Sequence, residues 1–89
     1  MIQCKLEICN KLGLHARAAA RFVQVASAYD SHITLARDSR EVNGKSIMGV
    51  MMLAAGKGVE IELIADGKDE QAAVAALDQL VRDRFGEDE

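Results

Sequence analysis

The start of the chain alternates between apolar and polar side chains. The apolar positions are Ile2, Cys4, Leu6 and Ile8. A period of two places successive side chains on opposite faces of a β-strand, so this segment predicts a strand with one apolar face. Three further segments of this kind, residues 32–36, 40–43 and 59–65, are bounded by turn residues. The sequence therefore predicts four strands.

The residues between the first two strands follow the period of a helix. From Ala16 to about Ala28 the apolar side chains recur on one side. The polar face of this predicted helix carries Arg17, Arg21 and Gln24. We therefore expect an amphipathic helix that packs on the sheet.

Two more helices are predicted after the third strand. Ser46 is a residue type that caps helix starts, and a short helix is expected over residues 47–53. A last helix is expected to begin at Asp69 or a neighbour. Its apolar stripe consists of Ala73, Val74, Leu77, Leu80 and Val81. The residues from Gly86 to Glu89 are expected to fray.

This order, β-α-β-β-α-β-α, predicts an α+β open-faced sandwich. Strands that keep one polar face need cover on one side only, so we expect a four-stranded antiparallel sheet covered on one face by three helices. Right-handed crossovers are expected to bring the first and last strands side by side in the middle of the sheet. The length of 89 residues fits a single domain, residues 1–89.

Composition narrows the function. The net charge of −3 argues against nucleic acid or an anionic membrane as the main partner, and only 3% of the residues are aromatic, which disfavours stacking on bases. No apolar run approaches the roughly 20 residues of a membrane span, and no signal peptide is recognisable, so a cytoplasmic protein is expected. Cys4 and Cys9 would lie roughly 16 Å apart on one strand, too far for a disulfide. No metal or other cofactor is expected.

The segment Gly13–Ala18 carries the candidate chemistry. It places His15 where a loop becomes a helix, with Arg17 two positions later. A helix start presents unpaired N–H groups and a partial positive charge, so a phosphoryl group on the His15 ring would be stabilised there. The guanidinium of Arg17 is suited to the same oxygens. The alternative is that His15 only caps the helix.

Two motifs together resemble the HPr family of phosphocarrier proteins, from the bacterial sugar phosphotransferase system. They are Asn10–Arg17 and Asn43–Met51, and the resemblance extends over essentially the whole chain. It implies that His15 accepts a phosphoryl group on Nδ1 from phospho-enzyme I and passes it to a histidine of an enzyme IIA domain. The protein would then be a stoichiometric carrier rather than an enzyme. Where the family usually has proline, this chain has Ala18, which affects the rigidity of the site and the transfer rate.

The resemblance also gives Ser46 a second role. In many members of the family this serine is phosphorylated by an ATP-dependent HPr kinase/phosphorylase, and the sequence leaves open whether that happens here. A carrier for sugar uptake and a mainly regulatory protein that acts by phosphorylation-dependent binding are therefore both retained, beside a generic ligand-binding module.

A docking face for these partners is expected around His15. It would be formed by Ala16, Ala20, Arg21, Gln24, Ile47, Met48 and Met51. Exposed apolar side chains often mark partner surfaces, and methionine adapts to several partners. Val50 and one of the methionines are expected to lie in the core instead. A monomer is expected.

Overall fold

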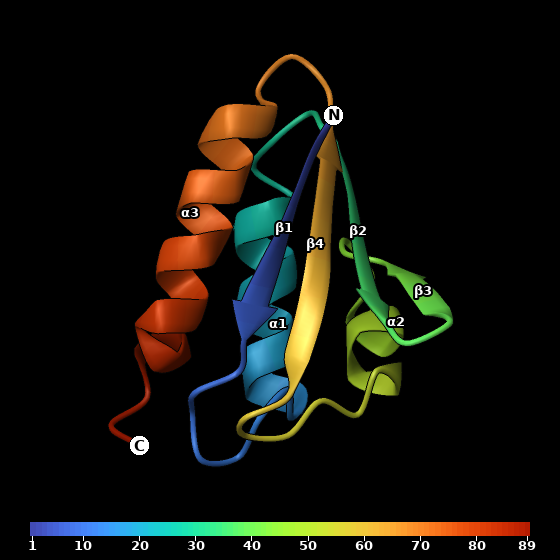
Figure 1. Cartoon of the computed structure of the whole chain (residues 1–89). Coiled ribbons are helices and arrows are strands. Elements are labelled where there is room, and N and C mark those ends of the chain that lie inside the picture. The colour runs from blue at the N-terminus through green and yellow to red at the C-terminus, as the bar shows by residue number, and fades with distance from the viewer.

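The computed structural model describes residues 1–89 and contains the expected elements (Figure 1). They are β1 (Ile2–Glu7), α1 (Ala16–Ala26), β2 (His32–Arg37), β3 (Arg40–Asn43), α2 (Ile47–Met52), β4 (Glu60–Asp66) and α3 (Glu70–Arg82). A terminal 3-10 turn (Arg84–Gly86), which the sequence pattern did not predict, follows α3. No helix is long and apolar enough to cross a lipid bilayer.

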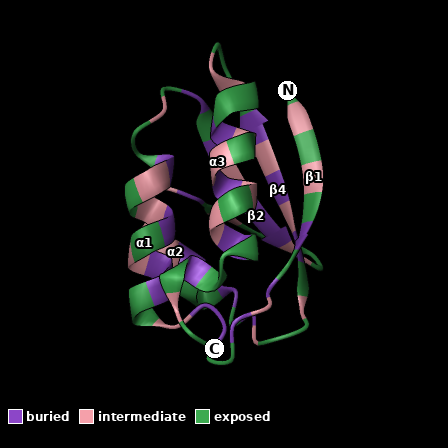
Figure 2. Ribbon diagram, turned by 90° about the vertical axis from the view of Figure 1, so that its left-hand side faces the viewer, coloured by how far each residue is buried: buried purple, intermediate pink, exposed green.

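The four strands form one antiparallel sheet with the order β1-β4-β2-β3. The three α-helices lie together on one face, and the buried residues lie between the two layers (Figures 1 and 2). The predicted fold class is confirmed. The first and last strands are neighbours, as expected, but the prediction that both are central is wrong. β4 lies between β1 and β2, and β3 pairs with β2, so no strand is left to pair with the outer side of β1.

One hydrophobic core joins the layers. The strands contribute their alternate positions, such as Leu6, Leu35 and Leu63, and the helices contribute Phe22 and Leu77. All five are at most 3% exposed. The amphipathic patterns in the sequence therefore correspond to buried faces.

The two cysteines lie beside α3 or near its end. Both are free and half-buried, in agreement with the sequence interpretation. Burial, followed by the charges of Asp78 and Glu62, raises the pKa of the Cys4 thiol. Cys9 donates from Sγ to the carbonyl oxygen of Val81 at 3.1 Å.

The helix α2 exposes its methionines. The prediction that one of them lies in the core is wrong, because Met48, Met51 and Met52 are 71%, 38% and 57% exposed. Only Val50 within this helix is buried, as expected, and Leu53 is buried just beyond it. Six residues make less than two turns, so a single narrow side faces the core.

The C-terminal residues fold back onto the protein, since Glu87 contacts Asn10 and His15 and Glu89 pairs with Lys11, so the prediction of a frayed tail is wrong. Phe85 is fully buried and anchors the 3-10 turn. Arg84 and Phe85 have φ of 55° and 56°, in the left-handed region, which reverses the chain after α3. As a result, Glu87 points back toward the start of α1.

We expect Ala18→Pro to stabilise the protein by about 0.4–1 kcal/mol through a less flexible unfolded chain. Ala18 is the third residue of α1, and its N–H has no acceptor, so a proline removes no hydrogen bond there. The matched control is Ala19→Pro, because the Ala19 N–H donates to the His15 carbonyl at 2.8 Å. Thermal unfolding would show a higher Tm for Ala18→Pro and a lower one for Ala19→Pro. A lower Tm in both would show that the ring cannot be accommodated at the buried Ala18 position.

Candidate functional site

His15 is the N-cap of α1. Its backbone is extended, with φ −75° and ψ 179°, and its ring Nδ1 accepts a hydrogen bond from the Arg17 N–H at 3.3 Å. Gly13 makes the preceding turn at φ +68°, where an added Cβ would lie 2.5 Å from the Ala55 carbonyl oxygen. The next residue, Leu14, donates its N–H to that same oxygen. The loop is thereby fixed against the segment after α2, and the His15 ring is held at the helix start.

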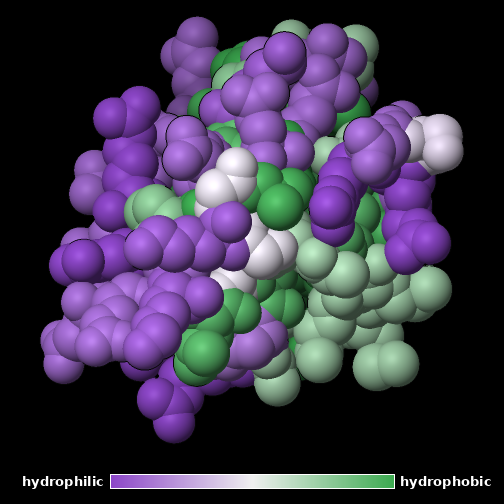
Figure 3. Space-filling view, turned by 60° about the horizontal axis from the view of Figure 1, so that its bottom comes forward, coloured by the Kyte–Doolittle hydropathy of each residue, from purple (hydrophilic) through white to green (hydrophobic).

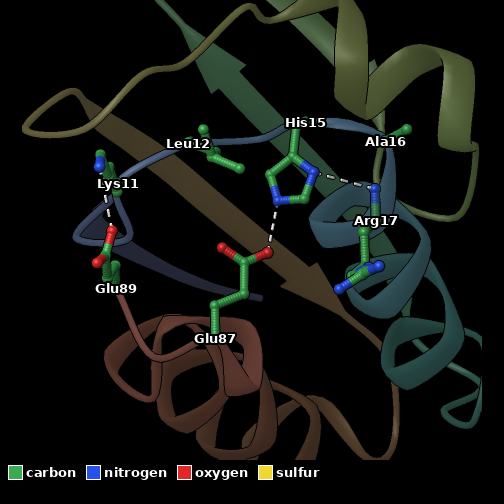
Figure 4. Close-up of a pocket in the computed structure, with 7 residues that line it drawn as sticks. All are labelled: Lys11, Leu12, His15, Ala16, Arg17, Glu87 and Glu89. Carbon is green, nitrogen blue, oxygen red and sulfur yellow. Dashed lines mark hydrogen bonds and ion pairs between the residues drawn. The ribbon is translucent and has the colours of Figure 1, made fainter.

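The other ring nitrogen of His15 is bound by Glu87. His15 Nε2 and Glu87 Oε2 are 2.5 Å apart (Figure 4). The second carboxylate oxygen, Oε1, accepts from Asn10 Nδ2 at 3.0 Å. Asn10 is fully buried, and the same Nδ2 donates to the Gly13 carbonyl at 2.8 Å. Three separate segments of the chain therefore fix the orientation of the imidazole.

These contacts determine which ring nitrogen carries the proton. Partial burial opposes ionisation of Glu87, but hydrogen bonds from Asn10 and His15, with the charges of His15 and Arg17, lower the pKa of its carboxyl. An ionised carboxylate only accepts hydrogen bonds, so Nε2 must donate to it. Nδ1 accepts from a backbone N–H and must keep its lone pair. In the neutral ring the proton is therefore on Nε2, and Nδ1 is the nucleophilic atom.

An open hollow lies beside the ring. It is lined by Lys11, Leu12, His15, Ala16, Arg17, Glu87 and Glu89. Lys11 pairs with Glu89 at 3.2 Å, whereas the guanidinium of Arg17 is exposed and has no such partner (Figure 4). A positive group without a partner at a helix start is suited to an incoming anion.

The residues expected to form a docking face surround the start of α1 and cover α2. Ala16 and Gln24 are exposed, and Ala20 is half-buried. Ile47 is 44% exposed and, with the methionines of α2, forms an apolar surface over this helix (Figure 3). Arg21 differs, because its Nη1 donates to the Phe85 carbonyl at 2.9 Å.

Ser46 caps α2, as the sequence predicted. Its Oγ accepts from the Gly49 N–H at 3.1 Å, and the side chain is half-buried. The neighbouring residues Ile47 and Met48 are both exposed, so this cap lies at the border of the apolar surface.

Five residues at the site were not among the predicted site residues: Asn10, Lys11, Leu12, Glu87 and Glu89. Leu12 is 67% exposed at the rim of the hollow. A sequence signal for Glu87 does exist, since it follows an aromatic residue and a glycine just after a helix, where chains commonly reverse. That signal indicates a reversal but not the segment that the chain returns to.

Fold and site together define a class: small α+β proteins that present a carboxylate-bound histidine at the first turn of a helix. A sequence model described as "PTS HPr component phosphorylation site" matches residues 2–83. The chain belongs to this family, the HPr phosphocarriers of the phosphotransferase system.

Individual relatives match over nearly the full length. The phosphocarrier protein HPr of Neisseria meningitidis serogroup A is 53% identical over 89 residues, which is 100% of both chains. The HPr-like protein Crh of Bacillus subtilis is 48% identical over 83 residues, 93% of this chain and 98% of that one. The crystal structure of HPr-C-His from Thermoanaerobacter tengcongensis has a TM-score of 0.96 at 47% identity, with both chains fully covered.

Proposed function

We propose that this protein is a stoichiometric phosphoryl carrier in which His15 Nδ1 is the acceptor atom. One observation carries the proposal: Nδ1 lies at the start of α1 and accepts a hydrogen bond only from a backbone N–H, while Nε2 contacts the Glu87 carboxylate, which favours a proton on Nε2 and an unprotonated Nδ1. In the transfer step Nδ1 attacks the phosphorus atom of the donor. A nitrogen–phosphorus bond forms on His15 as the bond to the donor's nitrogen breaks, and the proton stays on Nε2.

The surroundings stabilise the charge of the transferred group. The N–H groups of the first turn and the guanidinium of Arg17 neutralise the phosphoryl oxygens, which is the main requirement of phosphoryl transfer. The Nε2 proton makes His15 a better leaving group when the phosphoryl group moves on, because the ring leaves as neutral imidazole. The same site therefore supports transfer in both directions.

Family membership supports the choice of partners. We propose phospho-enzyme I as the donor and enzyme IIA domains as acceptors, docked on the surface formed by Ile47, Met48 and Met51 with Ala16, Ala20 and Gln24. An exposed apolar surface beside the acceptor atom would bring two histidines in line. We further propose that the protein acts as a cytoplasmic monomer, since each partner must reach the same face.

Incubation with enzyme I and phosphoenolpyruvate tests this function. Intact mass should increase by one phosphoryl group, and peptide mapping should locate it on His15. The adduct should be labile in acid and stable in base. After enzyme I and phosphoenolpyruvate are removed, addition of an excess of an enzyme IIA domain should return the mass to its starting value. A protein that stays unmodified with active enzyme I would exclude the carrier function.

A regulatory role through Ser46 is the second candidate. The Bacillus subtilis relative Crh is described as a catabolite repression HPr. We propose that phosphorylation of Ser46 by an HPr kinase/phosphorylase lowers docking to enzyme I. The support is position, because Ser46 is next to the exposed Ile47 and Met48. A protein whose main output is such binding, rather than sugar uptake, is the alternative function.

The substitution Ser46→Asp is expected to raise the apparent KM of enzyme I for this protein by about tenfold, which corresponds to about 1.4 kcal/mol. A carboxylate there adds negative charge to an apolar contact surface, while the start of α2 tolerates it. Steady-state phosphorylation kinetics provide the measurement. The control Gln71→Glu adds one charge at an exposed position near the start of α3 and should leave KM unchanged. Equal KM values for Ser46→Asp and the parent would reduce Ser46 to a helix cap.

A further inference from the structure

Arg21 connects α1 to the C-terminal segment. Its Nη1 donates to the Phe85 carbonyl oxygen at 2.9 Å. The guanidinium also lies against Gly86, where an added Cβ would be 2.4 Å from the same nitrogen. Arg21 is one helical turn after Arg17, but it is engaged with the protein's own backbone rather than available to a partner.

The segment that Arg21 contacts has an unusual backbone. Arg84, Phe85 and Gly86 have φ of 55°, 56° and 79°. Residues with a Cβ rarely adopt this left-handed conformation, so external contacts must hold the turn. The fully buried Phe85 ring is one such contact, and the Arg21 guanidinium, which binds the backbone of the turn itself, is another.

The direction of this turn determines where Glu87 lies. Glu87 is two residues after the carbonyl that Arg21 binds, and its two carboxylate oxygens reach Asn10 and His15. A rotation at Phe85 or Gly86 would move the carboxylate away from the ring. The position of Glu87, and with it the proton on His15 Nε2, therefore depends on the hold that Arg21 has on the turn.

We propose that Arg21 is a positioning residue for the phosphoryl acceptor, which acts through the Phe85–Gly86 turn and Glu87. This inference rests on the proposed function of His15. Without Arg21 the turn samples other conformations, and Glu87 leaves Nε2 for part of the time. The neutral ring then divides between its two tautomers, and the fraction with a free Nδ1 lone pair falls. Arg21 thus serves the site through an intramolecular contact at the surface, in place of the docking role expected from its position on α1.

The test compares Arg21→Gln with Arg21→Lys and with the control Arg82→Gln. Arg82 is 75% exposed and pairs only with Asp78, so the control removes the same charge without touching the turn. Nitrogen-15 chemical shifts of the His15 ring give the tautomer ratio when they are measured at a pH above the range in which histidine is charged. We expect Arg21→Gln to lower the Nε2–H fraction and to slow phosphorylation on the order of tenfold at saturating enzyme I, with Arg21→Lys intermediate and Arg82→Gln unchanged.

The substitution Glu87→Gln tests whether Arg21 acts on His15 through Glu87. If Arg21 acts through Glu87, adding Arg21→Gln to Glu87→Gln changes neither the tautomer ratio nor the rate further. Equal tautomer ratios in Arg21→Gln and the parent, or a change confined to KM, would overturn the inference in favour of a docking role. This outcome can be told apart from failure of the proposed function. If the proposed function is wrong, His15 remains unphosphorylated in the parent protein whatever its tautomer ratio.

Discussion

His15→Ala is expected to abolish phosphoryl acceptance from enzyme I completely. The substitution removes the nitrogen whose lone pair forms the bond to phosphorus, and no other side chain at this site is a comparable nucleophile. The fold should persist, because alanine loses the contact of Nε2 with Glu87 and the N-cap hydrogen bond from the Arg17 N–H, and neither is part of the hydrophobic core. Loss of an N-cap costs about 0.5–2 kcal/mol. Intact mass after incubation with enzyme I and phosphoenolpyruvate, with a thermal melt beside it, gives both results.

His32→Ala is the matched control for this experiment. His32 is the other histidine of the chain and is exposed at the first position of β2. Its replacement should leave phosphoryl acceptance intact. If His15→Ala still took up a full equivalent of phosphate and His32→Ala did not, the acceptor would be His32.

Arg17→Ala is expected to slow transfer about 10- to 100-fold without loss of the fold. A charge-assisted hydrogen bond is worth about 1.5–3 kcal/mol, and each 1.4 kcal/mol is a factor of ten. Arg17 is exposed, so its removal leaves the core untouched. The charge of Arg17 also helps to lower the pKa of the Glu87 carboxyl, so its removal should slow transfer to a smaller extent through Glu87 as well. Rapid-quench kinetics with enzyme I would measure the effect.

Two further variants test how Arg17 acts. Arg17→Lys keeps the charge but not the planar fork, and should recover only part of the rate. Lys68→Ala removes an exposed charge in the turn before α3, and should have no effect. Transfer by Arg17→Ala at the parent rate would make Arg17 an ordinary solvated side chain.

The local elements and both helix caps were predictable because they depend on neighbouring residues. Alternation gave the strands, and the residue types at His15 and Ser46 gave the two caps. The position of β1 at the edge was not predictable from its own pattern. Whether β1 lies at the edge or in the centre depends on whether β2 or β3 pairs with it or with another strand. That choice is a property of the whole sheet.

The Glu87 contact was missed for a different reason. It depends on left-handed backbone at Arg84 and Phe85, residue types that disfavour that conformation, so local preference argues against the turn that is observed. The stabilising contacts come from a distant part of the chain, namely Arg21 and the core around Phe85. The conformational preference of each residue type carries no information about contacts with distant residues that stabilise an unfavourable backbone conformation.

The dual use of His15 Nδ1 has a thermodynamic consequence. This nitrogen both accepts a hydrogen bond from the Arg17 backbone N–H and, in the proposed reaction, bonds to phosphorus. Once that bond forms, the lone pair is occupied and the amide must turn to a phosphoryl oxygen. The free energy of the first helical turn and the free energy of the stored phosphoryl group are thereby linked, so a tighter amide contact in the loaded state makes the group harder to give away. The NMR resonance of the Arg17 amide proton would then shift when His15 is phosphorylated and shift back when the phosphoryl group is transferred.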